Sequence, residues 1–447
     1  MSEYGVRLIS VFGMAVMMVV ASAGSACMYS PVNTGELTIY NEELITLTDT
    51  SMVVTWVTDE EGDTRILWDT SPELGNTAYG EATNDIYHYM ELTGLESGTK
   101  YYYRVCSTTD DGRQGIGPVH SFNTLTPPDG DYLFSFATIN DTHIGHDWDR
   151  NENGIEDTIE LLEQVVVEIN SREVAFTIIK GDITDHGLYA ALAGQQDEFG
   201  DAKEILDELE ADYYPIMGNH DIWPYDPTDP EYDEGPVGDE VFMDAFDLDS
   251  TYYSFDHGGY RFICIDSVSR DPALWGDPPA QDGGEIPDQE MQWLKTQLDS
   301  AESNDEKVVI FMHHPITEEA DSTAISLPLF QFTVDDDDAK EFRELISVYE
   351  NVIGVFSGHT HRNRVTYASE TEGMPYPETA ATMEYPGGYT IYRVYTDGYI
   401  QSFYKCKHLE LSEETRGNIG GGILESIEVA YKFGALEDRN FVYMYWD

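Results

Sequence analysis

The sequence predicts two domains of different class, an N-terminal all-β sandwich followed by a layered α/β domain. Its 447 residues allow two or three domains at about 150 residues each. Hydrophobic residues make up 41% and aromatic residues 12% of the chain, which excludes a disordered acidic polymer. The pattern also changes from short strands to alternating strands and helices near residues 125–130, which places the domain boundary there.

The first 27 residues predict an export signal. Arg7 precedes an uncharged apolar run from Leu8 to Ala26 that ends in small residues, the pattern of a secretory signal. Gly24-Ser25-Ala26-Cys27 resembles a lipoprotein processing site, so lipidation at Cys27, simple cleavage and an uncleaved anchor all remain open. Each alternative predicts an exported protein, extracellular or held at the cell surface, that meets the membrane only through this segment or a lipid anchor.

The four cysteines do not form a disulfide framework. Without Cys27 an odd number remains, namely Cys106, Cys264 and Cys406. Cys264 lies in the apolar run from Arg261 to Ile265 and is expected to be a buried thiol. We infer no catalytic cysteine.

Residues 36–125 have the pattern of a β-sandwich. Apolar runs such as Met52 to Val57 alternate with turn residues such as Glu61-Gly62-Asp63. The run LTGLESGTKYYYRV resembles the turn and tyrosine-rich strand of fibronectin type III domains, and Trp56 stands where that family has its core tryptophan. The resemblance implies a domain that positions other parts of the chain.

Beyond the linker from Leu125 to Gly130, residues 131–407 predict an α/β domain. Five apolar, strand-like runs alternate with helix-like stretches: Leu133 to Ile139, Val174 to Ile179, Tyr213 to Met217, Val308 to Met312 and Val352 to Phe356. The helix-like stretches are Glu156 to Asn170, Glu198 to Glu210, Asp288 to Ser300 and Ala339 to Tyr349. The extension at 408–447 is expected to add strands.

Polar residues follow directly after each of the five strand-like runs. The five clusters are Asp141-Thr142-His143, Gly181 to His186, Gly218-Asn219-His220-Asp221, His313-His314-Pro315 and Gly358-His359-Thr360-His361. Sites in open α/β sheets form at the carboxyl ends of strands. Imidazole and carboxylate ligands without thiolates suit Fe, Mn, Zn, Co or Ni, and this set has enough donors for two such metals.

These clusters resemble, in order and spacing, the five motifs of the calcineurin-like metallophosphoesterases. The runs YYSFDHGGYRFICIDS and QEMQWLKTQL resemble intervening segments of that family. The resemblance implies a β-sandwich flanked by helices. It also implies one metal held by Asp141, His143 and His361, a second held by Asn219, His313 and His359, and Asp182 bridging the two. The first histidine of the pair His313-His314 is chosen because it is the family's ligand.

The resemblance also implies a mechanism. A hydroxide between the metals would attack phosphorus. His220 would contact the phosphate and protonate the leaving oxygen, and Asp221 would orient His220. Asp185, His186 and His314 are candidates for substrate contact or for supporting the ligands.

A fibronectin-like domain ahead of such a catalytic domain resembles the purple acid phosphatases. Those enzymes have a tyrosine ligand three residues after the bridging aspartate, where this chain has Asp185, and they lack the histidine that this chain keeps as His143. We therefore expect no tyrosinate-to-iron colour, and this departure puts an Fe(III) requirement in doubt.

A candidate calcium loop follows the first cluster. Oxygen donors alternate along it and reach into the next helix: Asp149, Asn151, Asn153, Asp157 and Glu160. The string resembles an EF-hand or thrombospondin type 3 loop. Glu156 stands where an EF-hand has an apolar residue, which favours a solvated loop before the helix as the alternative to a Ca²⁺ site.

The charge is extreme, with 85 acidic against 23 basic side chains and a formal net charge of −62. Such a chain is repelled by nucleic-acid phosphates, so nucleic-acid binding is excluded as a primary role. Only nine of the basic residues are lysine. In molar salt the Debye length falls to about 3 Å, so the repulsion between the carboxylates of the chain is screened. Salt adaptation is the favoured explanation; a cation-binding surface and an acidic face for a cationic partner are the alternatives.

The sequence thus predicts an exported dinuclear-metal phosphoesterase acting on a small phosphate ester. An acid-phosphatase-like monoesterase comes first, and a phosphodiesterase or nucleotidase is the alternative. A surface binding protein that retains a metal site without catalysis is the hypothesis of a different class. Oligomeric state does not follow from the sequence.

Overall fold

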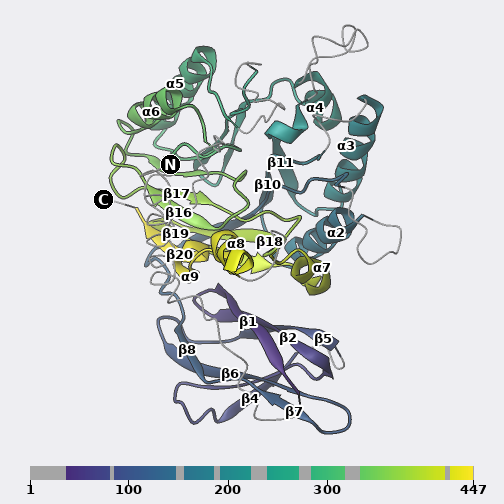
Figure 1. The fold of residues 1–447 in the computed structure, drawn as a ribbon. Helices are drawn as coiled ribbons and strands as arrows, with labels where there is room; N and C mark the ends of the chain where they lie inside the picture. Colours follow the sequence, from purple (N-terminus) through teal and green to yellow (C-terminus); the bar gives the residue numbers. More distant parts are fainter. Residues whose placement is uncertain are drawn as a thin grey trace, which may run out of the picture.

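The computed structural model describes residues 37–80, 85–146, 156–185, 192–222, 239–270, 283–317, 333–417 and 423–445. Within these ranges a β-rich domain is followed by a mixed α/β domain, which confirms the predicted fold class (Figure 1). Several sequence predictions fall outside the described residues: the N-terminal signal segment with Cys27, Asp149, Asn151, Asn153 and His186. Among the described helices, none combines the length and apolar character that a membrane span requires.

The N-terminal domain is a sandwich of two antiparallel sheets. One sheet pairs β1 (Ile39–Leu47), β2 (Ser51–Gly62) and β5 (Asp85–Thr93). The other contains β4 (Asn76–Tyr79), β3 (Arg65–Asp69), β6 (Lys100–Thr108), β7 (Gln114–Ile116) and β8 (His120–Asn123). Trp56 is fully buried in the core between the sheets, and its Nε1 donates to Ser107 Oγ at 2.9 Å.

His88 should make the stability of this domain depend on pH. The ring is fully buried, stacks on Trp56 and lies within 3.0 Å of the hydroxyls of Thr58 and Thr64. Burial lowers the pKa of His88 to about 4. Between about pH 6.5 and pH 4 the unfolded chain therefore binds a proton that the folded chain does not. The free energy of unfolding keeps its full value above about pH 6.5 and decreases by about 3 kcal/mol as the pH falls to 4.

His88→Gln should remove most of that loss, because glutamine keeps hydrogen-bonding groups but does not titrate. The measurement is the free energy of urea unfolding at pH 7.5 and pH 4.5, at constant molar salt, for both proteins. The same pH dependence in wild type and variant would contradict the prediction.

Two sheets form the centre of the α/β domain. The six-stranded sheet has the order β11 (Asp212–Ile216), β10 (Phe176–Lys180), β9 (Tyr132–Ile139), β18 (Gly388–Tyr395), β19 (Gly398–Lys405) and β20 (Asn440–Met444). The four-stranded sheet has the order β12 (Tyr253–His257), β13 (Tyr260–Cys264), β14 (Lys307–Phe311) and β15 (Val352–Phe356). Their facing sides share an aromatic core that includes Phe136, Phe176, Phe262 and Phe311.

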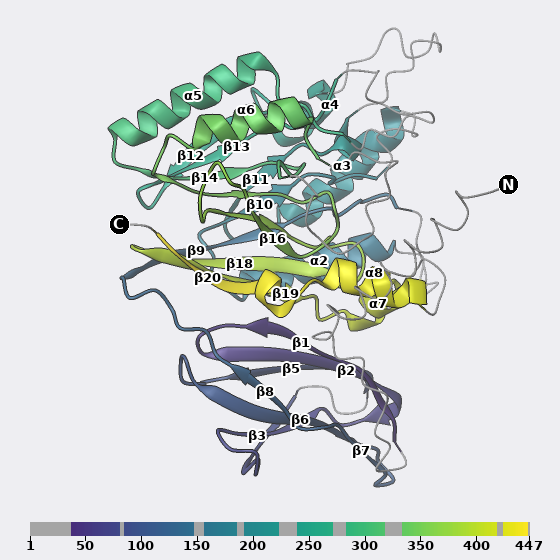
Figure 2. The ribbon, with the colours of Figure 1, turned by 60° about the vertical axis from the view of Figure 1, so that its left-hand side comes forward.

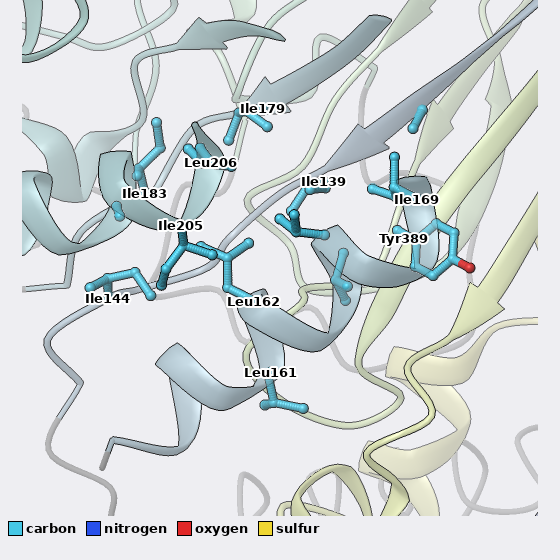
Figure 3. Packing of buried hydrophobic residues seen from close by; sticks show 14 of the residues in the cluster. Ile139, Ile144, Leu161, Leu162, Ile169, Ile179, Ile183, Ile205, Leu206 and Tyr389 are labelled. Carbon is cyan, nitrogen blue, oxygen red and sulfur yellow. The ribbon is translucent and has the colours of Figure 1, made fainter. Parts of the chain in front are cut away.

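Helices cover the outer face of each sheet, as Figure 2 shows for α5 and α6. The helices α2 (Asp157–Asn170) and α3 (Leu192–Leu206) pack on the six-stranded sheet, where Leu162 and Ile169 of α2 lie near Ile139 and Leu206 of α3 lies near Ile179 (Figure 3). The helix α4 (Asp239–Phe246) packs beside α3. The helices α5 (Asp288–Ser303) and α6 (Asp336–Ile346) cover the four-stranded sheet, and β16 (Arg364–Tyr367) pairs with β17 (Pro375–Glu378).

The C-terminal segment differs from its prediction. It was expected to add strands. Within residues 408–417 and 423–445 it contains one strand, β20, and three helices: α7 (Leu409–Glu414), α8 (Ile423–Phe433) and α9 (Leu436–Arg439). Ile427, Ala430 and Phe433 recur every three residues, a helical spacing that the prediction did not use. The thiols of Cys106, Cys264 and Cys406 are free and buried, as the prediction for Cys264 required.

The N-terminal domain is joined to the α/β domain by polar contacts as well as by packing. Ser402 of β19 donates to the carbonyl of Leu47 at 2.9 Å, and the Asn440 amide donates to the carbonyl of Ile45 at 2.9 Å. Glu43 of β1 is buried and forms ion pairs with Lys405 and Arg416. Burial opposes ionisation of Glu43, but these cations outweigh it and lower its pKa to about 2. The domain interface therefore contains a fully paired buried charge.

Candidate active site

Loops after five parallel strands of the two sheets meet in one place. The strands β9, β10 and β11 belong to the six-stranded sheet, and β14 and β15 belong to the four-stranded sheet. Each strand ends two or three residues before a predicted ligand. The structure brings together all seven side chains that the sequence singled out as ligands: Asp141, His143, Asp182, Asn219, His313, His359 and His361.

Asp141, His143, Asp182 and His361 form what we call the first ligand group. His143 Nε2 lies 3.3 Å from His361 Nε2 and 3.6 Å from Asp182 Oδ2. His361 Nε2 lies 3.5 Å from Asp141 Oδ1. One potential ligand atom of each side chain lies within 4.8 Å of the others.

Asp182, Asn219, His313 and His359 form the second ligand group. His313 Nε2 lies 2.9 Å from Asn219 Oδ1, 3.2 Å from His359 Nδ1 and 3.2 Å from Asp182 Oδ2. His313 is therefore at the centre of this group.

His314 lies nearby but is held differently. It is fully buried, its ring centroid lies 4.5 Å from that of His359, and its Nδ1 lies 3.0 Å from Ser267 Oγ. Its nitrogens also lie close enough to those of His313 and His359 to be counted among potential ligands. Its fully buried ring therefore packs against His359.

Asp182 belongs to both groups through one oxygen. Oδ2 faces His143 on one side and His313 on the other, while Oδ1 accepts the backbone N–H of His220 at 2.8 Å. The residue is only 1% exposed. Burial would raise its pKa, but His313 and His220 outweigh burial and hold the pKa well below the ordinary value. A buried, ionised carboxylate facing two histidine groups is the arrangement needed to bridge two cations.

The backbone at the ligands is in an unusual conformation. Asp141, His143, Asp182, His359 and His361 all have positive φ, between 44° and 66°. Non-glycine residues avoid this region at a cost of roughly 1–3 kcal/mol each. The loops therefore store strain at five of the seven ligands, which is typical of functional sites.

Glycines next to the ligands allow the loops to approach one another. A Cβ on Gly218 would lie 2.1 Å from the backbone nitrogen of Asp182 and 2.3 Å from Asp182 Oδ1. A Cβ on Gly181 would lie 2.5 Å from His313 Nδ1. This close approach explains why glycine precedes these ligands.

Gly218→Ala should displace Asp182 and lower turnover at least about 100-fold, since a misplacement of about 1 Å has that effect. Bound metal should fall in parallel. Gly200→Ala on α3 is the matched control, because no atom lies within 4 Å of the added Cβ. Metal content and initial rates of both variants test the prediction, and a fully active Gly218→Ala protein would contradict it.

Three of the ligand histidines donate a hydrogen bond from Nδ1, the ring nitrogen that does not face the site. His143 Nδ1 lies 2.9 Å from Asp185 Oδ1, His313 Nδ1 lies 2.8 Å from the Lys180 carbonyl, and His361 Nδ1 lies 2.8 Å from Glu384 Oε1. Each contact fixes the tautomer and orientation of the ring, so that the lone pair of Nε2 faces the site and can bind a cation. Burial opposes ionisation of Glu384, but His361 and Lys432 outweigh it and lower its pKa to about 2.

His220 lies at the open side of the site, with 29% of its side chain exposed. Its Nδ1 donates to the Asp185 carbonyl at 2.8 Å. Burial would lower its pKa, but the charge of Asp182 and contacts with Asp185 outweigh burial and raise the pKa. A raised pKa favours the protonated ring that a general acid needs.

Asp221 has a different role from the one predicted. Its Oδ1 accepts the N–H groups of Ile183 and Thr184, both at 2.9 Å, and its Oδ2 accepts that of Gly218 at 2.9 Å. It thus ties the loop of Asp182 to the loop of His220. The Asp185 carbonyl holds the His220 ring, which corrects the expectation that Asp221 orients it.

Asp185, a predicted candidate for substrate contact or for supporting the ligands, accepts from His143 and lies 2.9 Å from His146 Nδ1 through its other oxygen. The sequence did not single out His146 or Glu384. His146 follows the first cluster by three residues, which was the available signal. Glu384 lies in no cluster and had no signal.

The candidate calcium loop is only partly described. Asp157 is buried at the start of α2, and Glu160 lies in its first turn. Both positions suit carboxylates because the helix N-terminus is electropositive.

The site fits two cations. Two carboxylates, one amide oxygen and four imidazoles converge, and no cysteine belongs to either group among the described residues. This donor set suits Mn, Fe, Co, Ni or Zn.

Comparison with known proteins identifies the family. The sequence pattern of the calcineurin-like phosphoesterases matches residues 134–363, about half of the chain. The chain belongs to this family. The pattern of the N-terminal domain of purple acid phosphatases matches residues 43–124. As a calcineurin-like phosphoesterase the chain is a metal-dependent phosphoester hydrolase of a family that uses two metals.

Individual relatives of this calcineurin-like phosphoesterase are distant. It is 22% identical over 305 residues to a manganese-dependent ADP-ribose/CDP-alcohol diphosphatase of Arabidopsis thaliana, covering 61% of this chain and 91% of the relative. It is 24% identical over 176 residues to a cyclic GMP-AMP phosphodiesterase of Homo sapiens, covering 36% of each chain. A purple acid phosphatase from yellow lupin seeds aligns in structure with a TM-score of 0.43 and 13% identity, covering 83% of this chain and 73% of the other.

Proposed function

We propose that this chain hydrolyses phosphodiesters with two metals held by the first and second ligand groups. The observation that supports it most is Asp182 Oδ2, which lies 3.6 Å from His143 Nε2 and 3.2 Å from His313 Nε2 and so faces both groups. Two metals at these groups would supply an activated water at neutral pH and stabilise charge on the phosphate.

The protein's own residues supply the proton for the leaving group. His220 Nδ1 is occupied by the Asp185 carbonyl, so Nε2 is the atom available to donate. We propose that His220 Nε2 protonates the departing alcohol oxygen as the bond to phosphorus breaks. Asp185 keeps the ring in place, and Asp221 keeps the loop of His220 beside that of Asp182.

Charge favours a diester over a monoester, which reverses the order expected from the sequence. A diester carries one negative charge at neutral pH and a monoester close to two. Lys180, Arg362 and Lys432, the basic residues in contact with the ligand loops, each already hold a protein acceptor: Ser357, Glu378 and Glu384. The two relatives named above, a diphosphatase and a phosphodiesterase, support this choice.

The test is metal analysis followed by assays with bis(p-nitrophenyl) phosphate and p-nitrophenyl phosphate in the presence of Mn²⁺. Mn²⁺ is tried first because the Arabidopsis relative is named as manganese-dependent. We expect two metals per chain and a kcat/KM at least about 10-fold higher for the diester. A faster monoester would restore the phosphatase assignment. Two bound metals without turnover of either ester would favour the non-catalytic binding protein, and absence of metal would overturn both.

We also propose export into a salty medium. The Arg7 and Leu8 to Ala26 pattern supports export, and the net charge of −62 supports salt adaptation. We expect kcat/KM and the free energy of unfolding to be lower in dilute buffer than in molar salt, because salt screens the self-repulsion of the chain. Values independent of salt would overturn the salt adaptation while leaving the assignment of the site intact.

A further inference from the structure

Two contacts connect the C-terminal helix α8 to the first ligand group. His361 Nδ1 lies 2.8 Å from Glu384 Oε1, and the other oxygen of Glu384 accepts from Lys432 Nζ at 2.7 Å. Lys432 also pairs with Glu428 at 2.9 Å, one helical turn earlier. All of these side chains are largely buried, with 13% of Lys432 and 11% of Glu384 exposed.

The backbone around Lys432 is fixed against the loop that carries His361. Its carbonyl accepts the N–H of Asn363 at 3.0 Å, and Arg362 stacks on the Tyr431 ring with its guanidinium carbon 4.8 Å from the centroid. A Cβ on Gly434 would lie 2.0 Å from the Asn363 carbonyl oxygen. The lysine therefore extends from a rigid position next to the ligand loop.

The segment that carries Glu384 is also held from the other side. The Tyr385 hydroxyl donates to Glu43 of the N-terminal domain at 2.5 Å, and the Tyr385 N–H donates to Thr415 Oγ1 at 2.6 Å. Glu384 thus lies between an anchored neighbour and the Lys432 ammonium, which leaves its carboxylate one orientation in which Oε1 meets His361.

The ring of His313, at the centre of the second ligand group, is held from outside α8. His313 is held by the Lys180 carbonyl, a backbone group next to the Gly181-Asp182 turn. Loss of the Lys432 contact should therefore act on one group and spare the other.

We infer that Lys432 is a positioning residue for the first metal: it fixes Glu384, and Glu384 fixes His361 in the orientation that binds a cation. The inference rests on the proposed two-metal site and extends it to the C-terminal segment. The alternative is that Lys432 only stabilises the fold through its ion pairs. Outer contacts of ligand histidines typically change metal affinity by about 10- to 100-fold.

The experiment titrates metal-free protein with Mn²⁺ alone, followed by calorimetry and by electron paramagnetic resonance of the coupled metal pair, without turnover. For Lys432→Met we expect one dissociation constant to rise at least about 10-fold while the other stays within twofold. In this variant the resonance signal of the coupled metal pair should appear only at a higher Mn²⁺ concentration than in wild type. Lys432→Arg, which keeps a cation at Glu384, should recover part of the affinity.

Lys340→Met is the matched control. Lys340 lies on α6, pairs with Glu344 one turn later at 3.8 Å, and α6 carries no proposed ligand. The double variant Glu384→Gln/Lys432→Met should bind no more weakly than Glu384→Gln alone, because Lys432 acts through Glu384.

The outcomes separate the two proposals. Wild-type protein that binds no Mn²⁺ would overturn the proposed function itself. Two sites in wild type that are unchanged in Lys432→Met would overturn this inference alone. Equal weakening of both sites, with a larger drop in Tm than in Lys340→Met, would assign Lys432 a purely structural role and likewise overturn it.

Discussion

Asp182→Asn is expected to reduce bound metal from two ions per chain to one at most, and to lower kcat/KM at least about 1,000-fold, equivalent to ~4 kcal/mol. Asparagine keeps an oxygen for the His220 N–H but removes the negative charge that faces both ligand groups. Without that charge, two neighbouring cations repel each other with nothing between them to offset the repulsion.

Metal content by mass spectrometry and initial rates with saturating Mn²⁺ provide the measurement. Asp207→Asn is the matched control, because Asp207 is an exposed residue that pairs with Lys203 on the surface. Two tightly bound metals together with more than a tenth of the wild-type rate in Asp182→Asn would show that this carboxylate does not bridge.

His220→Ala is expected to lower kcat by about 100- to 10,000-fold while two metals remain bound. The ring belongs to neither ligand group, and its exposed position leaves Nε2 free to reach a substrate. The loss should depend on the leaving group. It should be large for a diester that releases an alkyl alcohol, which needs a proton, and small for one that releases p-nitrophenolate, which does not.

The comparison of the two leaving groups separates acid catalysis from simple loss of structure. Rates with bis(p-nitrophenyl) phosphate, measured by phenol release, and with a dialkyl phosphodiester, measured by alcohol release, give the two values. An equal loss for both leaving groups, or a missing metal, would remove His220 from the role of general acid.

Much of the site was accessible from sequence because each ligand lies within one to five residues of a strand end. Asp141, Asp182 and Asn219 follow apolar strand-like runs, and the same holds for His313 and His359. A short turn after a parallel strand leaves a side chain little choice of position, so strand ends in one sheet bring their ligands together. The same local logic predicted the strands β9, β10, β11, β14 and β15 and the helices α2, α3, α5 and α6, but not α4.

Residues that act over long separations could not be found in this way. Glu384 meets His361 across 23 positions, Lys432 meets Glu384 across 48, and Glu43 meets Tyr385 across 342. The correction to Asp221 has the same origin, because its contacts with Ile183 and Thr184 depend on how two loops approach one another. The helices of the C-terminal segment were missed because their apolar spacing is short and weak, and their stability depends on packing against the rest of the domain.

The sequence by itself determined the chemistry of this protein: which donors are present, that they follow strands, and that they suit two metals. Only the tertiary structure decided how those donors are aimed. The choice of ring nitrogen, the sharing of Asp182 between two groups and the dependence of His361 on a distant helix follow from contacts between elements. Short local motifs predict which residues are ligands, whereas the orientation of each ligand depends on hydrogen bonds that exist only after the chain has folded.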